Sequence, residues 1–267
     1  MRTTGWMTMA AMAMTVAACD SGATSDGTTE ATEASLSAGA AEGDGEALGS
    51  MAFPLTDVPS APGLPTAADR VQRFKAFVDS RLTCADAVAT AGGDGVTVTF
   101  DKDCTWAGRR WTGSVAITWD AGGNSADIVF DGVSVSGATL TGDMTVTRVE
   151  DGHVTVSADW TRTRGARTIE GSWDSDFSWT DTTYTVNSAT HSVKVNGRTA
   201  TRTSTAVVWQ KADPAPESGT VTFSGFRGNT WTMTFAKDES GAFTITVVGP
   251  RGTRTFTIGA AETVDPV

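Results

Sequence analysis

Two histidines and one run of alternating polar residues are the side chains of this sequence that could carry acid–base or metal chemistry. His153 and His191 belong to no His-Glu-x-x-His motif and to no other metal-binding spacing, so each is interpreted as a surface residue. The alternating polar residues would all lie on one face of a strand, where they could form a carboxylate pair or a calcium site. A solvated strand face is the simpler interpretation. The members are Glu170, Ser172, Asp174 and Asp176.

Other catalytic signatures do not occur in the sequence. It contains no Gly-x-Ser-x-Gly elbow and no phosphate-cradling glycine loop. Asp101 and Asp103 lie beside Cys104 without the rest of a calcium-binding loop. The sequence therefore predicts a protein that is not an enzyme, with no catalytic residue, cofactor or metal. A glycan hydrolase with paired carboxylates is the weakest hypothesis.

Tryptophan and threonine offer the other candidate surfaces. Tryptophans on a concave face could stack on sugars or cover a lipid, although core packing is favoured. A flat threonine array can bind ordered water or ice, but threonine is also a good exposed strand residue, and arginines interrupt the array. The tryptophans are Trp111, Trp119, Trp160, Trp173, Trp179, Trp209 and Trp231. The alternating threonines are Thr139, Thr141, Thr199, Thr201, Thr203, Thr205, Thr230, Thr232, Thr234, Thr253, Thr255 and Thr257.

These residues belong to strands, because no helical period appears after residue 95. Clusters of turn residues separate the predicted strands. The fold class is all-β with one N-terminal helix, a long antiparallel meander of about twelve strands that forms a barrel, half-barrel or sandwich. The predicted strands are 95–100, 110–119, 125–135, 138–149, 153–164, 167–179, 183–195, 198–210, 219–226, 229–237, 242–248 and 253–259.

A glycine repeat sets the expected register of the central strands. Gly113, Gly142 and Gly171 recur every 29 residues, a period typical of a repeated supersecondary unit. A two-residue turn at 165–166 pairs Trp160 with Gly171, and a three-residue turn at 150–152 pairs Trp160 with Gly142. The ring of Trp160 is therefore expected to cover bare backbone on both sides. The glycines serve packing in this interpretation.

One helix is predicted at about 67–82. Thr66 provides the N-cap and Asp69 a weak capping box. Apolar residues at helical spacing face a sheet, and Arg70 falls with the other basic residues on the opposite side. Cys84 and Cys104 follow the helix and are interpreted as a structural disulfide. The N-terminus described next predicts export and assigns the third cysteine, Cys19, to a lipid anchor, and an exported protein with two further cysteines favours a disulfide between them.

The N-terminus predicts export. Residues 1–18 read as a signal peptide, and Val16-Ala17-Ala18-Cys19 resembles the lipobox of bacterial lipoproteins. That resemblance implies cleavage before Cys19 and its acylation. Residues 19–50 are acidic and almost without large aliphatic side chains, so they are expected to form a disordered tether. Residues 51–267 would form the β-meander domain.

With its lipobox and its repeated Gly-x-x-apolar-Thr-Gly unit, the chain resembles uncharacterised β-rich bacterial lipoproteins. The resemblance implies a lipid anchor in the bacterial cell envelope, periplasmic or surface-exposed, and a meander architecture.

Function is narrowed to two hypotheses. The first is a membrane-anchored, non-enzymatic structural or interaction module that uses its exposed sheet face or edges and has a filled core. The alternative is a periplasmic carrier that binds a lipid or other hydrophobic ligand in a groove between the curved sheet and the helix. The expected partners are the membrane, through the acyl anchor at Cys19, and a protein or hydrophobic ligand. The net charge of −11 argues against nucleic acid.

Overall fold

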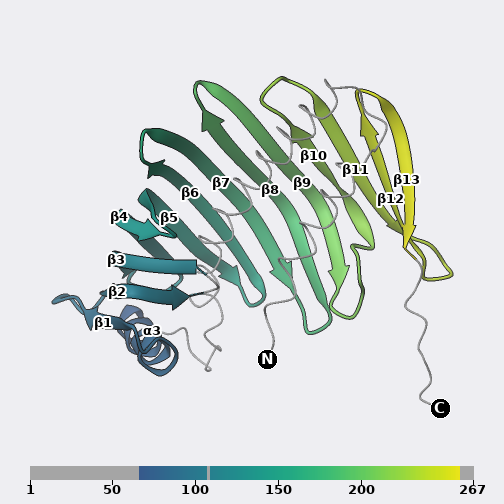
Figure 1. Cartoon of the computed structure of the whole chain (residues 1–267). Coiled ribbons are helices and arrows are strands. Elements are labelled where there is room, and N and C mark those ends of the chain that lie inside the picture. Colours follow the sequence, from purple (N-terminus) through teal and green to yellow (C-terminus); the bar gives the residue numbers. More distant parts are fainter. Residues whose placement is uncertain (1–65, 107–108, 259–267) are drawn as a thin grey trace, which may run out of the picture. The chain divides into compact units, whose positions relative to one another are not determined.

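In the computed structural model, residues 66–106 and 109–258 are described, and they form one helix and thirteen strands (Figure 1). The predicted signal peptide, tether and Cys19 lie outside these residues. Helix α3 spans Ala67–Arg81. The strands are β1 (Ala85–Ala89), β2 (Gly95–Trp106), β3 (Arg109–Trp119), β4 (Ser125–Val135), β5 (Ala138–Glu150), β6 (His153–Arg164), β7 (Arg167–Trp179), β8 (Thr183–Val195), β9 (Arg198–Gln210), β10 (Ser218–Ser224), β11 (Thr230–Lys237), β12 (Phe243–Gly249) and β13 (Gly252–Ile258).

The strands form an antiparallel meander, and their order in the sheet follows their order in the chain. Among the described strands, β1 and β13 end this order, so the sheet is not closed into a barrel. The predicted all-β class with one helix is confirmed. The described chain divides into a first compact unit, residues 66–174 with 194–197, and a second unit, residues 175–193 with 198–258.

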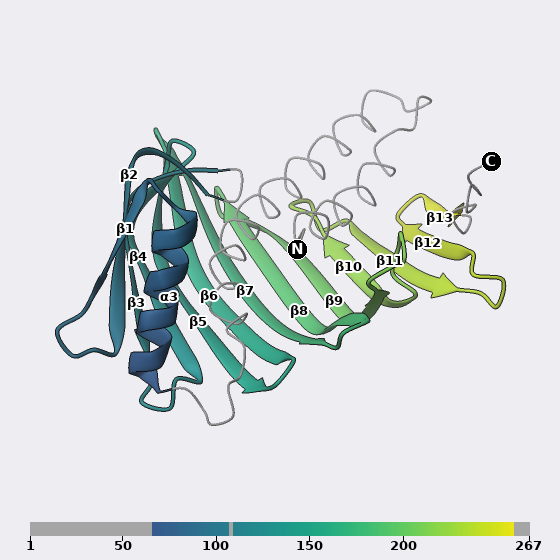
Figure 2. The ribbon, with the colours of Figure 1, turned by 90° about the horizontal axis from the view of Figure 1, so that it is seen from below.

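Helix α3 begins where the sequence supplies an N-cap. The Thr66 hydroxyl accepts a hydrogen bond from the N–H of Asp69 (3.3 Å), and the Asp69 carboxylate accepts one from the N–H of Thr66 (3.1 Å). The predicted capping box is thus confirmed. Hydrogen bonds from the Thr66 side chain and backbone lower the pKa of Asp69. The helix lies along one face of the first unit's strands (Figure 2), with the Phe74 ring 5.8 Å from that of Trp119.

The first unit buries one face of its sheet. Buried and exposed residues alternate along β3, β4, β5 and β6, as a one-sided antiparallel sheet requires. Together with α3, these buried side chains form an apolar layer in which most tryptophans of the first unit take part. The largest fully buried members include Phe74, Phe100, Trp111, Ile117, Ile128, Phe130 and Met144.

The predicted central register is confirmed. Trp160 pairs with Gly142 between β5 and β6, and Val156 pairs with Val146. Between β6 and β7, the Ser157 hydroxyl donates to Asp174 at 2.7 Å. That side-chain contact joins two residues that the predicted turn at 165–166 places directly opposite each other.

The repeat glycines make room for Trp160 in two different ways. A methyl group on Gly171 would lie 2.1–2.7 Å from three ring atoms of Trp160, so the ring does cover this glycine. At Gly142 the close neighbours are the Asp159 carbonyl oxygen (2.2 Å from an added Cβ) and the Trp160 Cα, with φ at +139°. The expectation of ring cover on both sides is therefore correct for Gly171 and wrong for Gly142, where backbone meets backbone.

The strand boundaries differ from the prediction at the start of the sheet. β1 was not predicted because only Ala87 is buried in it, so no apolar alternation marks it. It is held by pairing with β2 and by contact with α3. β2 continues beyond the predicted end at residue 100 because the ladder with β3 resumes at Cys104 after a bulge.

Substitution of Gly171 by alanine tests this packing. Gly171→Ala drives a methyl group into the Trp160 ring, which is itself confined beside β5, so we expect a loss of about 1–3 kcal/mol in the free energy of unfolding. Gly122→Ala is the matched control in a turn, where the added Cβ meets only ends of polar side chains, the Asn124 amide at 3.2 Å and the Asp120 carboxylate at 3.7 Å; it should change stability by less than about 0.5 kcal/mol. Urea titrations measure both.

A double variant isolates the contact between the two residues. Trp160→Leu combined with Gly171→Ala should lose less than the sum of the two single losses, since the shorter side chain removes the clash. Strictly additive losses would contradict the proposed contact.

Candidate functional site

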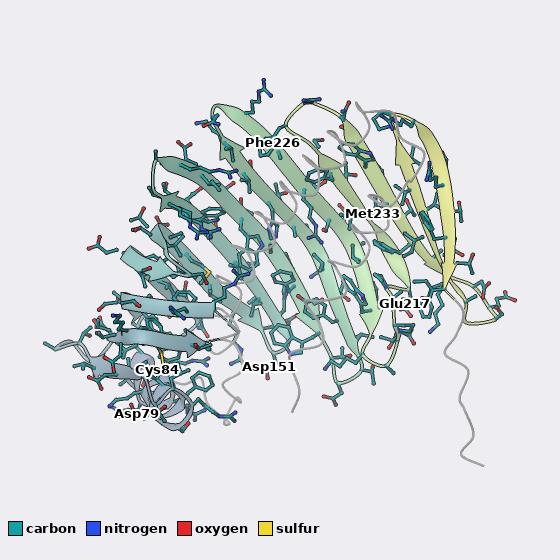
Figure 3. The ribbon with its side chains drawn as sticks, in the orientation of Figure 1. Asp79, Cys84, Asp151, Glu217, Phe226 and Met233 are labelled. Carbon is teal, nitrogen blue, oxygen red and sulfur yellow. A yellow bond between two sulfur atoms is a disulfide. The ribbon has the colours of Figure 1, made fainter. Side chains whose placement is uncertain are left out.

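The cysteine pair forms a disulfide, which joins the segment after α3 to β2 (Figure 3). The Cα atoms of Cys84 and Cys104 are 5.1 Å apart, and Cys104 is fully buried. Beside the bridge, the N–H of Asp101 donates to the carbonyl of Cys84 at 2.9 Å. The disulfide thus holds the end of the helix against the bulge of β2. The third predicted site residue, Cys19, lies outside the described residues.

The two histidines occupy different environments. His153 follows the β5–β6 turn, and its Nδ1 is 3.9 Å from the Glu150 carboxylate, with the imidazole 23 % exposed. His191 lies on β8, where burial and the positive charge of Arg202 lower its pKa to about 3. His191 is therefore neutral at neutral pH, and it is half-buried rather than fully exposed.

The alternating carboxylates of β7 each have a separate partner. Asp174 accepts from Ser157, Asp176 accepts from the side-chain amide of Asn187 at 2.6 Å, and Glu170 pairs with Lys194 at 2.8 Å. In the described part of the chain, no three His, Cys, Asp or Glu side chains come together in a geometry for a metal ion. These acids lie on the polar face of the sheet, which agrees with the solvated-face interpretation.

The tryptophans of the first unit contribute to its core. Four of them are at most 6 % exposed: Trp111, Trp119, Trp160 and Trp173. The indole N–H of Trp111 donates to the carbonyl of Trp106 at 3.2 Å, within an aromatic cluster that includes Phe100. In the second unit, Trp209 and Trp231 are half-buried. Trp231 packs over Gly249, where an added Cβ would lie 2.6 Å from the ring.

The second unit carries the most regular surface, here called the threonine face. It comprises the polar-side residues of β9 to β13. One row of directly paired residues crosses all five strands and is entirely threonine: Thr205, Thr220, Thr234, Thr246 and Thr255. The next row is Thr203, Thr222, Thr232, Val248 and Thr253. Hydroxyls of neighbouring strands approach each other at 3.4 Å between Thr222 and Thr232.

The arginines of these strands lie on the other side of the sheet. Arg202 pairs with Phe223 and Arg254 with Val247, both at positions of the apolar face. The expectation that arginines interrupt the threonine array is therefore wrong, because alternation sends them to the opposite face. No charged residue occupies either threonine row, and Thr205, Thr234 and Thr255 are exposed.

The polar face of the first unit differs in charge. Asp143 and Asp159 are exposed and stand directly opposite each other on β5 and β6. Asp127 accepts a hydrogen bond from Thr145 at 2.7 Å on the neighbouring row. The sheet therefore presents carboxylates on the polar face of the first unit and uncharged hydroxyls on the threonine face.

A small cavity lies beside α3 in the first unit. Its volume is about 10 Å³, enough for a single water-sized group. It is lined by the side chain of Arg70, which the helical pattern places among outward-facing basic residues; in the structure Arg70 is 3 % exposed. That prediction is wrong; Arg70 lies one turn before the buried Phe74, at the border of the apolar stripe of the helix. The cavity is far too small for an acyl chain.

Comparisons of the chain with protein-family models, curated proteins and solved structures gave no match. The helix in the described residues is too short and too polar to cross a membrane.

Proposed function

We propose that the chain is a lipid-anchored, non-enzymatic interaction module of the bacterial cell envelope, and that the threonine face is its contact surface. The observation that carries this proposal is the absence of charge from the two threonine rows in a chain of net charge −11. Natural sheets use charged residues at their edge strands to oppose association with another chain. By the same physical argument, an uncharged, partly exposed and periodic face offers no charge repulsion to a partner and suits a contact.

The chemistry of the face defines the kind of partner. Each threonine offers one hydroxyl, which donates and accepts, and one methyl group. A partner protein that presents an uncharged surface of hydroxyl and amide groups would be matched over several strands. Because neighbouring strands are about 4.8 Å apart and alternate residues about 6.7 Å apart, the contact would repeat in two directions.

The acyl anchor supplies the location in this proposal. A lipobox at Val16–Cys19 followed by a long acidic segment would tether the folded units to a membrane while leaving the threonine face free. The cavity beside α3 holds no more than one water-sized group, so it is not itself a site for a hydrophobic ligand.

The anchor is tested on the protein isolated from its own envelope. Intact mass spectrometry should show cleavage before Cys19 and added acyl mass, and Cys19→Ser should move the protein from the membrane fraction to the soluble fraction. Cys19 is the residue that would carry the acyl chains, so its loss removes the hydrophobic anchor. A mature protein without acyl mass would refute the anchor and leave the contact surface untouched.

The contact surface is tested by site-specific photo-crosslinking in cells. A photoreactive residue at Thr246, in the all-threonine row of the threonine face, should give a discrete protein adduct. The matched control is the same residue at Thr118, an exposed strand threonine of the first unit that pairs with Asp127. Equal adducts from both positions, or none from Thr246, would count against the threonine face.

A second candidate function rests on the regularity of the all-threonine row. Rows of methyl and hydroxyl groups with fixed spacing in two directions can order water as an ice surface does. The twist of about 20–25° between neighbouring strands confines any lattice match to a few strands, and the most exposed block is β11 to β13.

Ice affinity separates this candidate from a protein contact. Full-length protein carrying Cys19→Ser should be enriched in a slowly grown ice hemisphere, whereas the additional change Thr234→Lys with Thr246→Lys should return it to the excluded liquid. Lysine introduces hydrated, mobile charges into the row. Thr118→Lys is the control and should keep the enrichment; a parent protein that stays in the liquid rules ice binding out.

A further inference from the structure

Arg70 and Arg148 converge on the cavity beside α3, although they lie far apart in the sequence. Arg70 comes from the first turn of the helix and Arg148 from the end of β5. The turn between β3 and β4 completes the lining with Gly123, Asn124 and Ser125. All of these elements belong to the first unit.

Each guanidinium is fixed by one neighbour. The Nε of Arg70 donates to the carbonyl of Gly123 at 3.0 Å. Arg148 pairs through Nη2 with the carboxylate of Asp151, and its backbone N–H donates to the carbonyl of Asn124 at 2.8 Å. Both side chains are therefore held in place at the rim of the cavity, so their remaining donors have defined positions.

The remaining donors of the two arginines are buried without a partner. Among the residues that the structure describes, neither Nη1 of Arg70 nor Nη1 of Arg148 has a hydrogen-bond acceptor. Arg70 is 3 % exposed and the Arg148 side chain 15 % exposed. A buried charged donor without an acceptor lowers the free energy of unfolding by about 1–3 kcal/mol or more. A bound group that accepts these hydrogen bonds would therefore stabilise the unit.

The charges around the cavity favour an anion over a water molecule. Burial, Arg148 and Arg73 lower the pKa of Arg70, while Asp120 opposes this shift. The Oδ1 of Asp120 already accepts from the N–H groups of Asn124 (2.7 Å) and Ser125 (3.0 Å), which closes the turn. A neutral water could bridge the two Nη1 atoms but would leave the repulsion between the guanidinium groups in place.

We propose that the cavity between Arg70 and Arg148 is a carboxylate-binding site, which accepts one carboxylate oxygen between the two guanidinium groups. The volume of about 10 Å³ matches one oxygen-sized group and excludes a whole phosphate. The carboxylate comes either from a small organic acid or from a glutamate or aspartate of a partner protein. The site is independent of the threonine face, which belongs to the second unit.

Thermal unfolding of full-length protein carrying Cys19→Ser tests the site. At equal sodium concentration and pH, saturating acetate should raise Tm by about 3 °C more than chloride does, because the ligand binds only the folded state. A second arm uses a capped tripeptide, Gly-Glu-Gly, whose single carboxylate represents a protein partner, with Gly-Gln-Gly as its neutral control. Stabilisation by both ligands assigns the site to a protein carboxylate, and stabilisation by acetate alone assigns it to a small acid.

Variants separate specific binding from a general salt effect. Arg70→Met keeps the length of the buried side chain and should abolish the difference between acetate and chloride, and Arg148→Met should do the same. Arg81→Met, an exposed arginine at the end of the same helix, should retain it. A parent protein without the acetate increment, or an increment of equal size in either cavity variant, would overturn the proposal.

Discussion

Trp160 fixes the register of β5, β6 and β7, because its ring fits only against a residue that has no side chain. Gly171 supplies that space, and Gly142 lets the β5 backbone approach the Trp160 Cα with a positive φ that other residues avoid. A slip of one residue would remove both fits and would turn every apolar side chain of the strand toward solvent. The alternation of the whole first unit depends on this register.

The same alternation decides where charge can lie. In the second unit it sends Arg202 and Arg254 to the apolar side of the sheet and leaves the other side to threonine. In the first unit it places Asp143 opposite Asp159 on the polar side, a like-charge pair that does not stabilise the strand pairing. The two polar faces therefore differ in chemistry although they follow one pattern, and only the uncharged one can associate closely without a counter-charge.

Much of this arrangement could be predicted from the sequence. Period-two alternation and turn residues located twelve of the strands, and turn length alone paired Trp160 with Gly171. β1 could not be predicted, because Ala87 is its only buried residue and its partners are β2 and a helix. The sequence shows the threonines of the threonine face only as alternating runs within single strands. Their alignment into rows depends on the register across five strands. The bulge between Ser218 and Thr220 shifts the register of β10 against β9, and turn length does not predict this shift.

Arg70 shows the limit of pattern reading. A helical pattern assigns arginines to the solvent side because burial of an unpaired charge is costly. Arg70 nevertheless precedes the buried Val71 and lies one turn before Phe74, at the border of the apolar stripe. Whether such a border residue is buried depends on what α3 packs against, and here that is a turn 53 residues further along the chain. Gly123 accepts one hydrogen bond from the Nε of Arg70, and the buried Nη1 of Arg70 is left without an acceptor among the described residues. Burial of the Arg70 charge beside Arg148 has a physical reason if a carboxylate lies between the two guanidinium groups. For a purely structural role, an apolar residue of similar length would stabilise the fold better.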